Sequence, residues 1–144
     1  MFIGEYKHTI DPKKRLAIPV KFRKELGGKA VLTRGPDGCL FIFPMKEWEQ
    51  LAEKLGKLPF GQQDSRGFVR LLLAGASEVE FDQLGRILVP DFLKDYAVLK
   101  KEVIIAGLFN KLEIWDEARW SSYKANLEKN SDRIAEKLGE LGII

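Results

Sequence analysis

Cysteine and histidine are nearly absent from this chain of 144 residues, which has one of each. A single cysteine, Cys39, excludes an internal disulfide and a cysteine-rich zinc site. His8 has no second histidine to help it hold a metal, so a polar surface role is expected rather than catalysis. The sequence therefore predicts no metal and no other cofactor.

Long apolar runs and familiar catalytic motifs are also missing. No segment approaches the roughly 18 apolar residues of a membrane-spanning helix, and the first residues lack a basic segment followed by an apolar signal. The chain has no phosphate-binding loop, dinucleotide fingerprint or nucleophile elbow. We expect a cytoplasmic, non-enzymatic protein with no membrane partner and no small-molecule substrate.

Positive charge is concentrated near the start of the chain. The formal net charge is only +3. Up to Arg34, however, basic residues far outnumber Glu5, Asp11 and Glu25; they are Lys7, Lys13, Lys14, Arg15, Lys21, Arg23, Lys24, Lys29 and Arg34. Such a cluster is typical of a polyanion-binding face, although an ordinary solvated surface is the alternative.

One pattern occurs twice: an aspartate, three variable residues, an arginine, an apolar run and a proline. The copies are residues 11–19 and 82–90. With one residue gained in the second copy, the match continues through Gly35 with Gly107, Leu40 with Leu112, Ile42 with Ile114, Trp48 with Trp120 and Leu55 with Leu127. Two copies are too few for a solenoid. We predict two halves that complete one core, with strands of 1–55 pairing with strands of 79–127.

Hydrophobic periodicity and turn residues predict the same elements in both halves. The first half should contain strands over 2–10 and 16–18, a helix over 20–26, a hairpin of 30–33 with 39–43, and a helix after Pro44. The second should contain strands over 79–81 and 87–89, a helix over 92–97, a hairpin of 103–105 with 112–115, and a helix capped by Asp116. Trp48 and Trp120 lie beside leucines, which favours core packing over stacking on bases.

The predicted organisation is a single compact domain. Residues 1–56 form the first repeat, 57–78 a connecting segment with an apolar helix, 79–128 the second repeat, and 129–144 a C-terminal helix. The apolar stretch Phe68 to Gly75 lies between the copies, and the C-terminal helix bearing Ile134 and Leu138 has no equivalent after the first copy. We expect both to pack into the core, with an exposed contact between subunits as the alternative.

The paired Asp-x-x-x-Arg motifs carry the main functional hypothesis. Asp11 and Asp82 can accept hydrogen bonds from backbone N–H groups of their own turns. Arg15 and Arg86 would then stand at the turn edges, where a guanidinium can donate to phosphate oxygens or to guanine in a major groove. The alternative is that each aspartate and arginine merely brace a turn. Two copies, with lysines around the first, favour nucleic-acid contact.

A family resemblance rests on these motifs together with three other segments. They are Met1 to Tyr6 with His8 to Asp11, Arg70 to Ala76, and Gly107 to Trp115. Over nearly its whole length the chain resembles the MraZ family. That resemblance implies an AbrB-like swapped-hairpin, double-split β-barrel with appended helices. It also implies a nucleoid-associated transcriptional regulator of the division and cell wall gene cluster, including its own operon. Ring-like homo-oligomers would bind double-stranded DNA.

Carried over to this sequence, the family signature falls on Asp11 with Arg15 and on Asp82 with Arg86. Gly85 fits the family glycine before the second arginine, whereas Lys14 replaces it in the first copy. Glycine accepts a positive φ cheaply and lysine does not. We predict DNA contacts by both arginines, with both aspartates ordering the loops, and backbone-positioning contacts by Lys7, Lys13, Lys14, Lys21, Arg23 and Lys24.

Two other functions compete with DNA regulation. Related swapped-hairpin proteins include antitoxins that bind toxins through a tail, so an antitoxin-like or other protein-interaction module is the first alternative. An antitoxin would more often carry one copy of the motif and a longer acidic extension. An enzyme using Asp11 and Asp82 as paired carboxylates is the second, and the scarcity of histidine and cysteine disfavours it.

Overall fold

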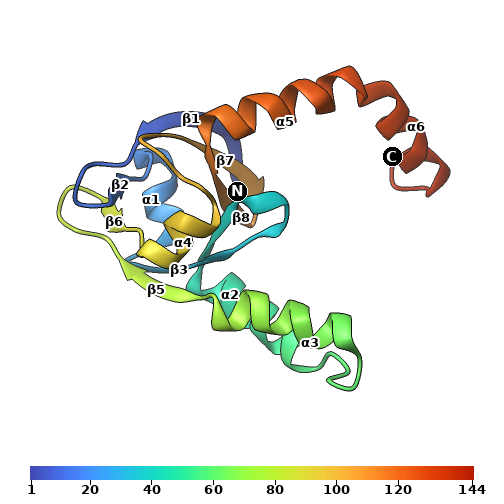
Figure 1. The fold of residues 1–144 in the computed structure, drawn as a ribbon, viewed down its shortest axis with the longest axis horizontal. Coiled ribbons are helices and arrows are strands. Elements are labelled where there is room, and N and C mark those ends of the chain that lie inside the picture. Colours follow the sequence, from blue (N-terminus) through green and yellow to red (C-terminus); the bar gives the residue numbers. More distant parts are fainter.

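The computed structural model describes residues 1–144, which form a mixed α+β fold with two sheets and six α-helices (Figure 1). The strands are β1 (Phe2–Thr9), β2 (Arg15–Ala17), β3 (Lys29–Arg34), β4 (Leu40–Pro44), β5 (Ser77–Glu80), β6 (Arg86–Leu88), β7 (Glu102–Phe109) and β8 (Lys111–Asp116). The helices are α1 (Val20–Leu26), α2 (Met45–Gly56), α3 (Gln63–Val69), α4 (Asp91–Tyr96), α5 (Glu117–Lys129) and α6 (Ser131–Glu140). The predicted mixture of strands and appended helices is confirmed.

The two halves of the chain share their sheets. The main sheet has the order β1-β7-β8-β4-β3-β5, and β2 pairs with β6 in a second sheet. Strand β1 of the first half therefore pairs with β7 of the second, and β5 of the second half pairs with β3 of the first. Every strand pair is antiparallel. The predicted pairing of strands between the halves is confirmed.

The pairing registers show a pseudo-twofold axis between the halves. In the small sheet Leu16 pairs with Ile87, its equivalent in the repeat, with Arg15 opposite Leu88 and Ala17 opposite Arg86. In the main sheet Phe41 pairs with Glu113, which is again the equivalent residue. Because equivalent residues pair with each other, the two Asp-x-x-x-Arg loops are related by the same axis.

One detail of the predicted repeat alignment is wrong. Arg34 pairs with Leu40 and Gly107 pairs with Leu112, so Arg34, rather than Gly35, occupies the place of Gly107. The reason is the turn that follows. The first hairpin turns through a 3₁₀ segment, Pro36–Gly38, whereas the second turns tightly at Asn110, whose N–H donates to Leu108 O at 2.7 Å.

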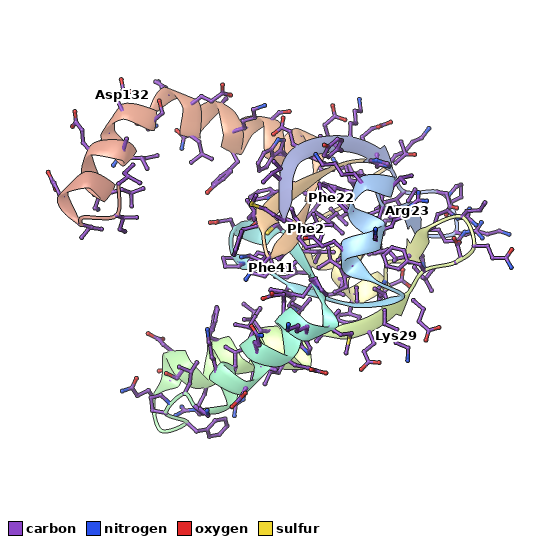
Figure 2. The ribbon with its side chains drawn as sticks, turned by 180° about the vertical axis from the view of Figure 1, so that it is seen from behind. Phe2, Phe22, Arg23, Lys29, Phe41 and Asp132 are labelled. Carbon is purple, nitrogen blue, oxygen red and sulfur yellow. The ribbon has the colours of Figure 1, made fainter.

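The hydrophobic core lies between the main sheet, the β2–β6 pair and helices α1 and α4. Phe22 and Leu26, four residues apart on α1, are both buried, and α4 buries Leu93. Figure 2 places Phe2 and Phe22 in this interior, where their ring centroids lie 5.5 Å apart. The main sheet does not close on itself, because β1 and β5 remain its edges.

Two helical arms project from the core. Helices α2 and α3 form one, and α5 with α6 the other (Figure 1). Asp116 caps α5 by accepting a hydrogen bond from the N–H of Arg119, as predicted. Trp48 packs against Phe43 and Trp120 against Trp115, with ring centroids 5.8 Å and 5.4 Å apart. Both tryptophans are half-buried, so the predicted core packing is seen only in part. No helix has both the length and the apolar character needed to cross a membrane.

The expectation that both apolar appendages pack into the core is wrong for α6 and holds only in part for the stretch Phe68–Gly75. Helix α6 buries no residue, and Phe68 on α3 is 41% exposed. Only the π-helical turn Arg70–Ala74 reaches the core, through Leu72, whose carbonyl oxygen accepts a hydrogen bond from Thr33 Oγ1 at 2.7 Å. The physical reason is that the arms extend away from the sheet, so their apolar faces meet no core of their own (Figure 1).

Candidate nucleic-acid interface

Two loops lie side by side at the end of the molecule opposite α6 (Figure 1). The first, residues 11–14, joins β1 to β2, and the second, residues 82–85, joins β5 to β6. The antiparallel pairing of β2 with β6 brings the loops together, although 71 residues separate their equivalent positions in the sequence. The structure thus presents two copies of the motif on one surface.

Each aspartate holds its loop in the same way. Asp11 Oδ1 accepts hydrogen bonds from the backbone N–H groups of Lys13 (2.8 Å) and Arg15 (2.9 Å). Asp82 Oδ1 accepts from those of Leu84 and Arg86, both at 2.9 Å. These hydrogen bonds from backbone N–H groups stabilise the ionised carboxylates, and they hold the pKa of each aspartate below the ordinary value. Both carboxylates are therefore charged at neutral pH.

Each arginine is fixed against the aspartate of its own loop. Arg15 Nε donates to Asp11 Oδ2 at 3.0 Å, and Arg86 Nε donates to Asp82 Oδ2 at 2.8 Å. The structure therefore shows the turn bracing that was the alternative to DNA contact. The arginine side chains remain 33% and 25% exposed, so bracing by Nε leaves part of each guanidinium on the surface. Contact of these arginines with DNA stays a prediction.

The lysine that replaces glycine adopts the same backbone conformation as its counterpart. Lys14 has φ 64° and Gly85 has φ 74°. The carbonyl oxygen of Lys14 accepts a hydrogen bond from the N–H of Val89 at 2.9 Å, and that of Gly85 accepts from Ile18 at 3.1 Å. Each loop is therefore bonded to the opposite half, which holds Lys14 in the left-handed region despite its side chain.

Packing explains why only one loop keeps its glycine. A Cβ atom at Gly85 would lie 2.2 Å from Cζ of Arg23, whose Nε donates to Ile18 O at 2.6 Å. Lys94 is the equivalent of Arg23 in the second half, 71 residues later, and it lies beside the first loop. In the first loop the residue equivalent to Gly85 is Lys14, whose ammonium group contacts the Asp91 carboxylate. Arg23 therefore occupies the space that a side chain at position 85 would take.

The other predicted basic residues are distributed unevenly. Lys13 lies exposed at the tip of the first loop and Lys24 lies exposed on α1, and neither forms an ion pair. Lys21 donates to Tyr6 Oη at 3.0 Å. Lys7 lies on β1, where it pairs with Glu117 at 3.3 Å, so it is the weakest of the predicted DNA contacts.

The single histidine and the single cysteine both have shifted pKa values. Burial, followed by the nearby charge of Arg23, lowers the pKa of His8, which is therefore neutral at pH 7. Cys39 is fully buried, and desolvation followed by the adjacent Glu113 raises the pKa of its thiol. No group of three or more histidine, cysteine, aspartate or glutamate side chains is arranged to hold a metal ion.

Several surface residues near the loops were not predicted from the sequence. Gln83 and Leu84 form the tip of the second loop, where Leu84 is 65% exposed. Lys94, Lys100 and Lys101 line a cavity beside the first loop. The repeat contained a signal for Lys94, because this residue stands where the first copy has Arg23.

This arrangement suits contact with a double helix. Two loops related by a pseudo-twofold axis present the same backbone arrangement twice on one surface, and proteins with twofold symmetry bind duplex DNA through such equivalent elements. The exposed guanidinium edges can reach phosphates or base edges, and the lysines add positive charge around them.

Comparisons with known proteins agree with this description. The family model described as "MraZ protein, putative antitoxin-like" matches the chain twice, over residues 1–71 and 72–139. Proteins named "Transcriptional regulator MraZ" from Halothermothrix orenii and Acetivibrio thermocellus are 50% and 49% identical over 143 residues, covering 99% of this chain and 100% of theirs. The protein of that name from Carboxydothermus hydrogenoformans is 50% identical over 138 residues, 96% of each chain. With two matched repeats and half of its residues shared with these relatives, the chain belongs to the MraZ family.

Proposed function

We propose that this chain is a transcriptional regulator that binds double-stranded DNA in a sequence-specific manner. The observation that carries this proposal is the pair of loops that present Arg15 and Arg86 on one surface. The regulator name of its full-length relatives supports it. The protein acts on the chromosome in the cytoplasm, and its targets are its own operon and the division and cell wall genes.

The arginines and the lysines of the loops make different kinds of contact with DNA. Both guanidinium groups direct their remaining N–H donors to base edges or groove phosphates, while Asp11 and Asp82 keep the arginines in place. Lys13 and Lys14 of the first loop contact phosphates, which fixes position without reading sequence. Arg23, Lys21 and Lys24 on α1 extend the positive surface beyond the loops. No enzymatic step is part of this function.

The crossed pairing of the halves supports a swapped-hairpin origin for the fold. Residues 1–56 and 79–128 act as two half-units of one domain, since neither half contains the partner strands of its own outer strand. The segments 57–78 and 129–144 supply the two arms. In this description the double-split barrel consists of the main sheet together with the β2–β6 pair.

A homo-oligomer, in a ring-like assembly, is the proposed active form. Its support is helix α6, none of whose residues is buried, together with a cavity of about 360 Å³ lined in part by Phe41, Leu51 and Phe68. Helix α6 and the helices α2 and α3 lie away from the DNA-facing loops (Figure 1). Repeated protomers would present repeated loops, so weak contacts with spaced copies of a short site add through effective concentration.

An antitoxin-like role is the second candidate, because the family description itself uses that term. Its proposed surface would be the C-terminal arm rather than the loops. Two observations favour regulation of DNA: the motif occurs in two structurally equivalent copies, and the C-terminal segment forms helix α6 rather than a long acidic extension.

The test is binding of the full chain to a duplex taken from upstream of its own gene, compared with a scrambled duplex, over a range of salt concentrations. Preference for the upstream duplex is expected, with log affinity falling linearly with log salt. Lys13→Ala should weaken binding to both duplexes equally. It should also reduce the slope of log affinity against log salt by about one unit, as expected for the loss of one phosphate contact. Equal binding of both duplexes by the unaltered chain would contradict the proposal.

A further inference from the structure

Three lysines line a cavity of about 510 Å³ on one side of the paired loops. Lys94 extends from the last turn of α4, and Lys100 and Lys101 lie in the turn that leads from α4 to β7. The opposite wall consists of the end of β1 and the start of the first loop, including Asp11 and Pro12. The cavity therefore lies next to the surface proposed to face DNA.

Backbone hydrogen bonds fix the lysines in this position. The N–H of Ile10 donates to Lys101 O at 2.8 Å, which joins the turn to the base of the first loop. The N–H of Leu99 donates to Lys94 O at 3.0 Å, which closes the turn after α4. Figure 1 shows this turn passing beside the connection between β1 and β2. The three ammonium groups thus come from a backbone that is held in place.

The lysines that line the cavity form no ion pairs, although Lys100 and Lys101 also line an adjoining pocket with Glu102, Asp116 and Glu117. Asp11, the only carboxylate in the lining, is already occupied by Arg15 Nε and two backbone N–H groups. The nearby Glu102 lies 3.9 Å from Lys7 Nζ and is paired there.

The residues beside the second loop differ from those beside the first. The hydrogen bond from Ile10 N–H to Lys101 O has an equivalent in the other half, from Phe81 N–H to Gly28 O at 3.5 Å. Gly27 and Gly28 therefore occupy, beside the second loop, the positions of Lys100 and Lys101 beside the first. Arg23 replaces Lys94, and its Nε is used by Ile18 O. The two loops are alike in backbone but differ in the charge beside them.

We propose that Lys94, Lys100 and Lys101 bind a phosphodiester group of the DNA backbone and thereby fix the direction in which the protomer lies on the duplex. This inference rests on the proposed DNA-binding function. Ammonium groups donate strong hydrogen bonds to phosphate oxygens. Such contacts set the register and the orientation of a protein on DNA. Two loops with the same backbone would allow a protomer to lie on DNA in either direction. Lys13 and Lys14 of the first loop already make the two directions unequal in energy, and a phosphate contact by the three lysines on the same flank increases that difference.

The test uses the full chain with Lys100→Ala and Lys101→Ala combined, on the upstream and scrambled duplexes. The salt slope of log affinity should fall by about one unit for each phosphate contact removed, for both duplexes. A matched control, Lys57→Ala with Lys129→Ala, removes the same charge from the arms and should leave the slope unchanged. Lys100→Gln with Lys101→Gln repeats the test with longer polar side chains, and thermal unfolding verifies that each variant is folded.

Orientation is measured with a DNA-cleaving iron chelate. The buried Cys39 is replaced by Ser and the chelate is attached through Gln83→Cys at the tip of the second loop. With the lysines intact, cleavage should fall on one side of the upstream site. Without Lys100 and Lys101, the share of cleavage on the opposite side should rise.

Three results would overturn the inference. An unchanged salt slope in both lysine variants would do so, as would a ratio of cleavage on the two sides that stays the same without Lys100 and Lys101. The third is saturable binding of inorganic phosphate that needs the lysines while DNA affinity does not, since that would assign the cavity to a free phosphate compound. In all three cases the upstream preference of the unaltered chain remains, which separates failure of this inference from failure of the proposed function.

Discussion

Arg86 Nη1 lies 3.6 Å from Asp11 Oδ2, so the arginine of the second loop reaches the aspartate of the first. The reverse contact is missing, because Arg15 forms its ion pair only with Asp11. Asp11 therefore faces both guanidinium groups, and Arg86 is held by two carboxylates where Arg15 is held by one. The pseudo-twofold symmetry of the backbone does not extend to these charges.

This difference predicts unequal roles for the arginines. Arg15→Ala should reduce the preference for upstream over scrambled DNA by roughly 1 to 3 kcal/mol per base contact, with a small change in thermal stability. Arg86→Ala should lower both the specificity and the melting temperature, because it also releases the contact between the loops. Binding assays and thermal unfolding of the two variants provide the measurement.

Replacing each arginine by lysine distinguishes contact with bases from bracing of the turn. Arg15→Lys keeps the charge but loses the planar fork of donors, so specificity should fall while the salt slope is retained. If Arg15→Lys and Arg86→Lys both bind with unchanged affinity and specificity, the arginines only brace their turns.

The glycine at position 85 should be required, whereas the lysine at position 14 should be replaceable. Gly85→Lys must displace Arg23 from Ile18 O and should destabilise the fold by at least about 2 kcal/mol, from a lost charged hydrogen bond and a left-handed lysine. Lys14→Gly should change stability by no more than about 1 kcal/mol, since relief of the left-handed backbone offsets the entropy of glycine. Denaturant unfolding measures both.

Arg23→Ala provides the control for this comparison. In the Arg23→Ala background the side chain that covers Gly85 is gone, so adding Gly85→Lys should cost less than it does in the unaltered chain. Strictly additive effects of the two substitutions would show that Arg23 is not the reason for the glycine.

The order of both loops should resist acid. The pKa values of Asp11 and Asp82 are lowered below the ordinary value of about 3.9 by backbone N–H donation. A lowered folded-state pKa gives stability that is present above the unfolded value and is lost as pH falls through the folded value. Amide resonances of Lys13 and Leu84 should therefore keep their positions down to about pH 4 and change below it.

An asparagine variant assigns this transition to a loop. With Asp82→Asn the second loop has no titrating carboxylate, so the acid response of the Leu84 amide should disappear while that of Lys13 remains. A transition of the unaltered chain centred well above pH 4 would mean that the carboxylates are not stabilised as described.

Helix α6 should be required for assembly. Leu138→Glu places a charge on its apolar face and should shift the particle mass measured by light scattering toward the protomer, because burying an unpaired charge in an interface is costly. Ala125→Glu on α5 makes the same charge change on an exposed position and serves as the control. A protomer mass for the unaltered chain at all concentrations would exclude the proposed oligomer.

The sequence by itself determined the elements and their pairing. Phe22 and Leu26 at helical spacing, the glycine-rich turns and the repeated Asp-x-x-x-Arg motif are local signals, and each acts over a few residues of chain. The repeat added one long-range constraint, because two equal halves that cannot close alone must share their strands. That is why the mixed fold and the pairing of the halves could be predicted.

Only the tertiary structure decided how the charges are used. Three contacts join residues far apart in sequence. Asp11 pairs with Arg86, Arg23 covers Gly85, and Lys94 and Lys101 lie together beside the first loop. The exposure of α6 was decided in the same way, because an apolar stripe has the same pattern whether it faces its own core or another subunit. Local periodicity records which residues share a face, and the path of the chain determines what that face meets.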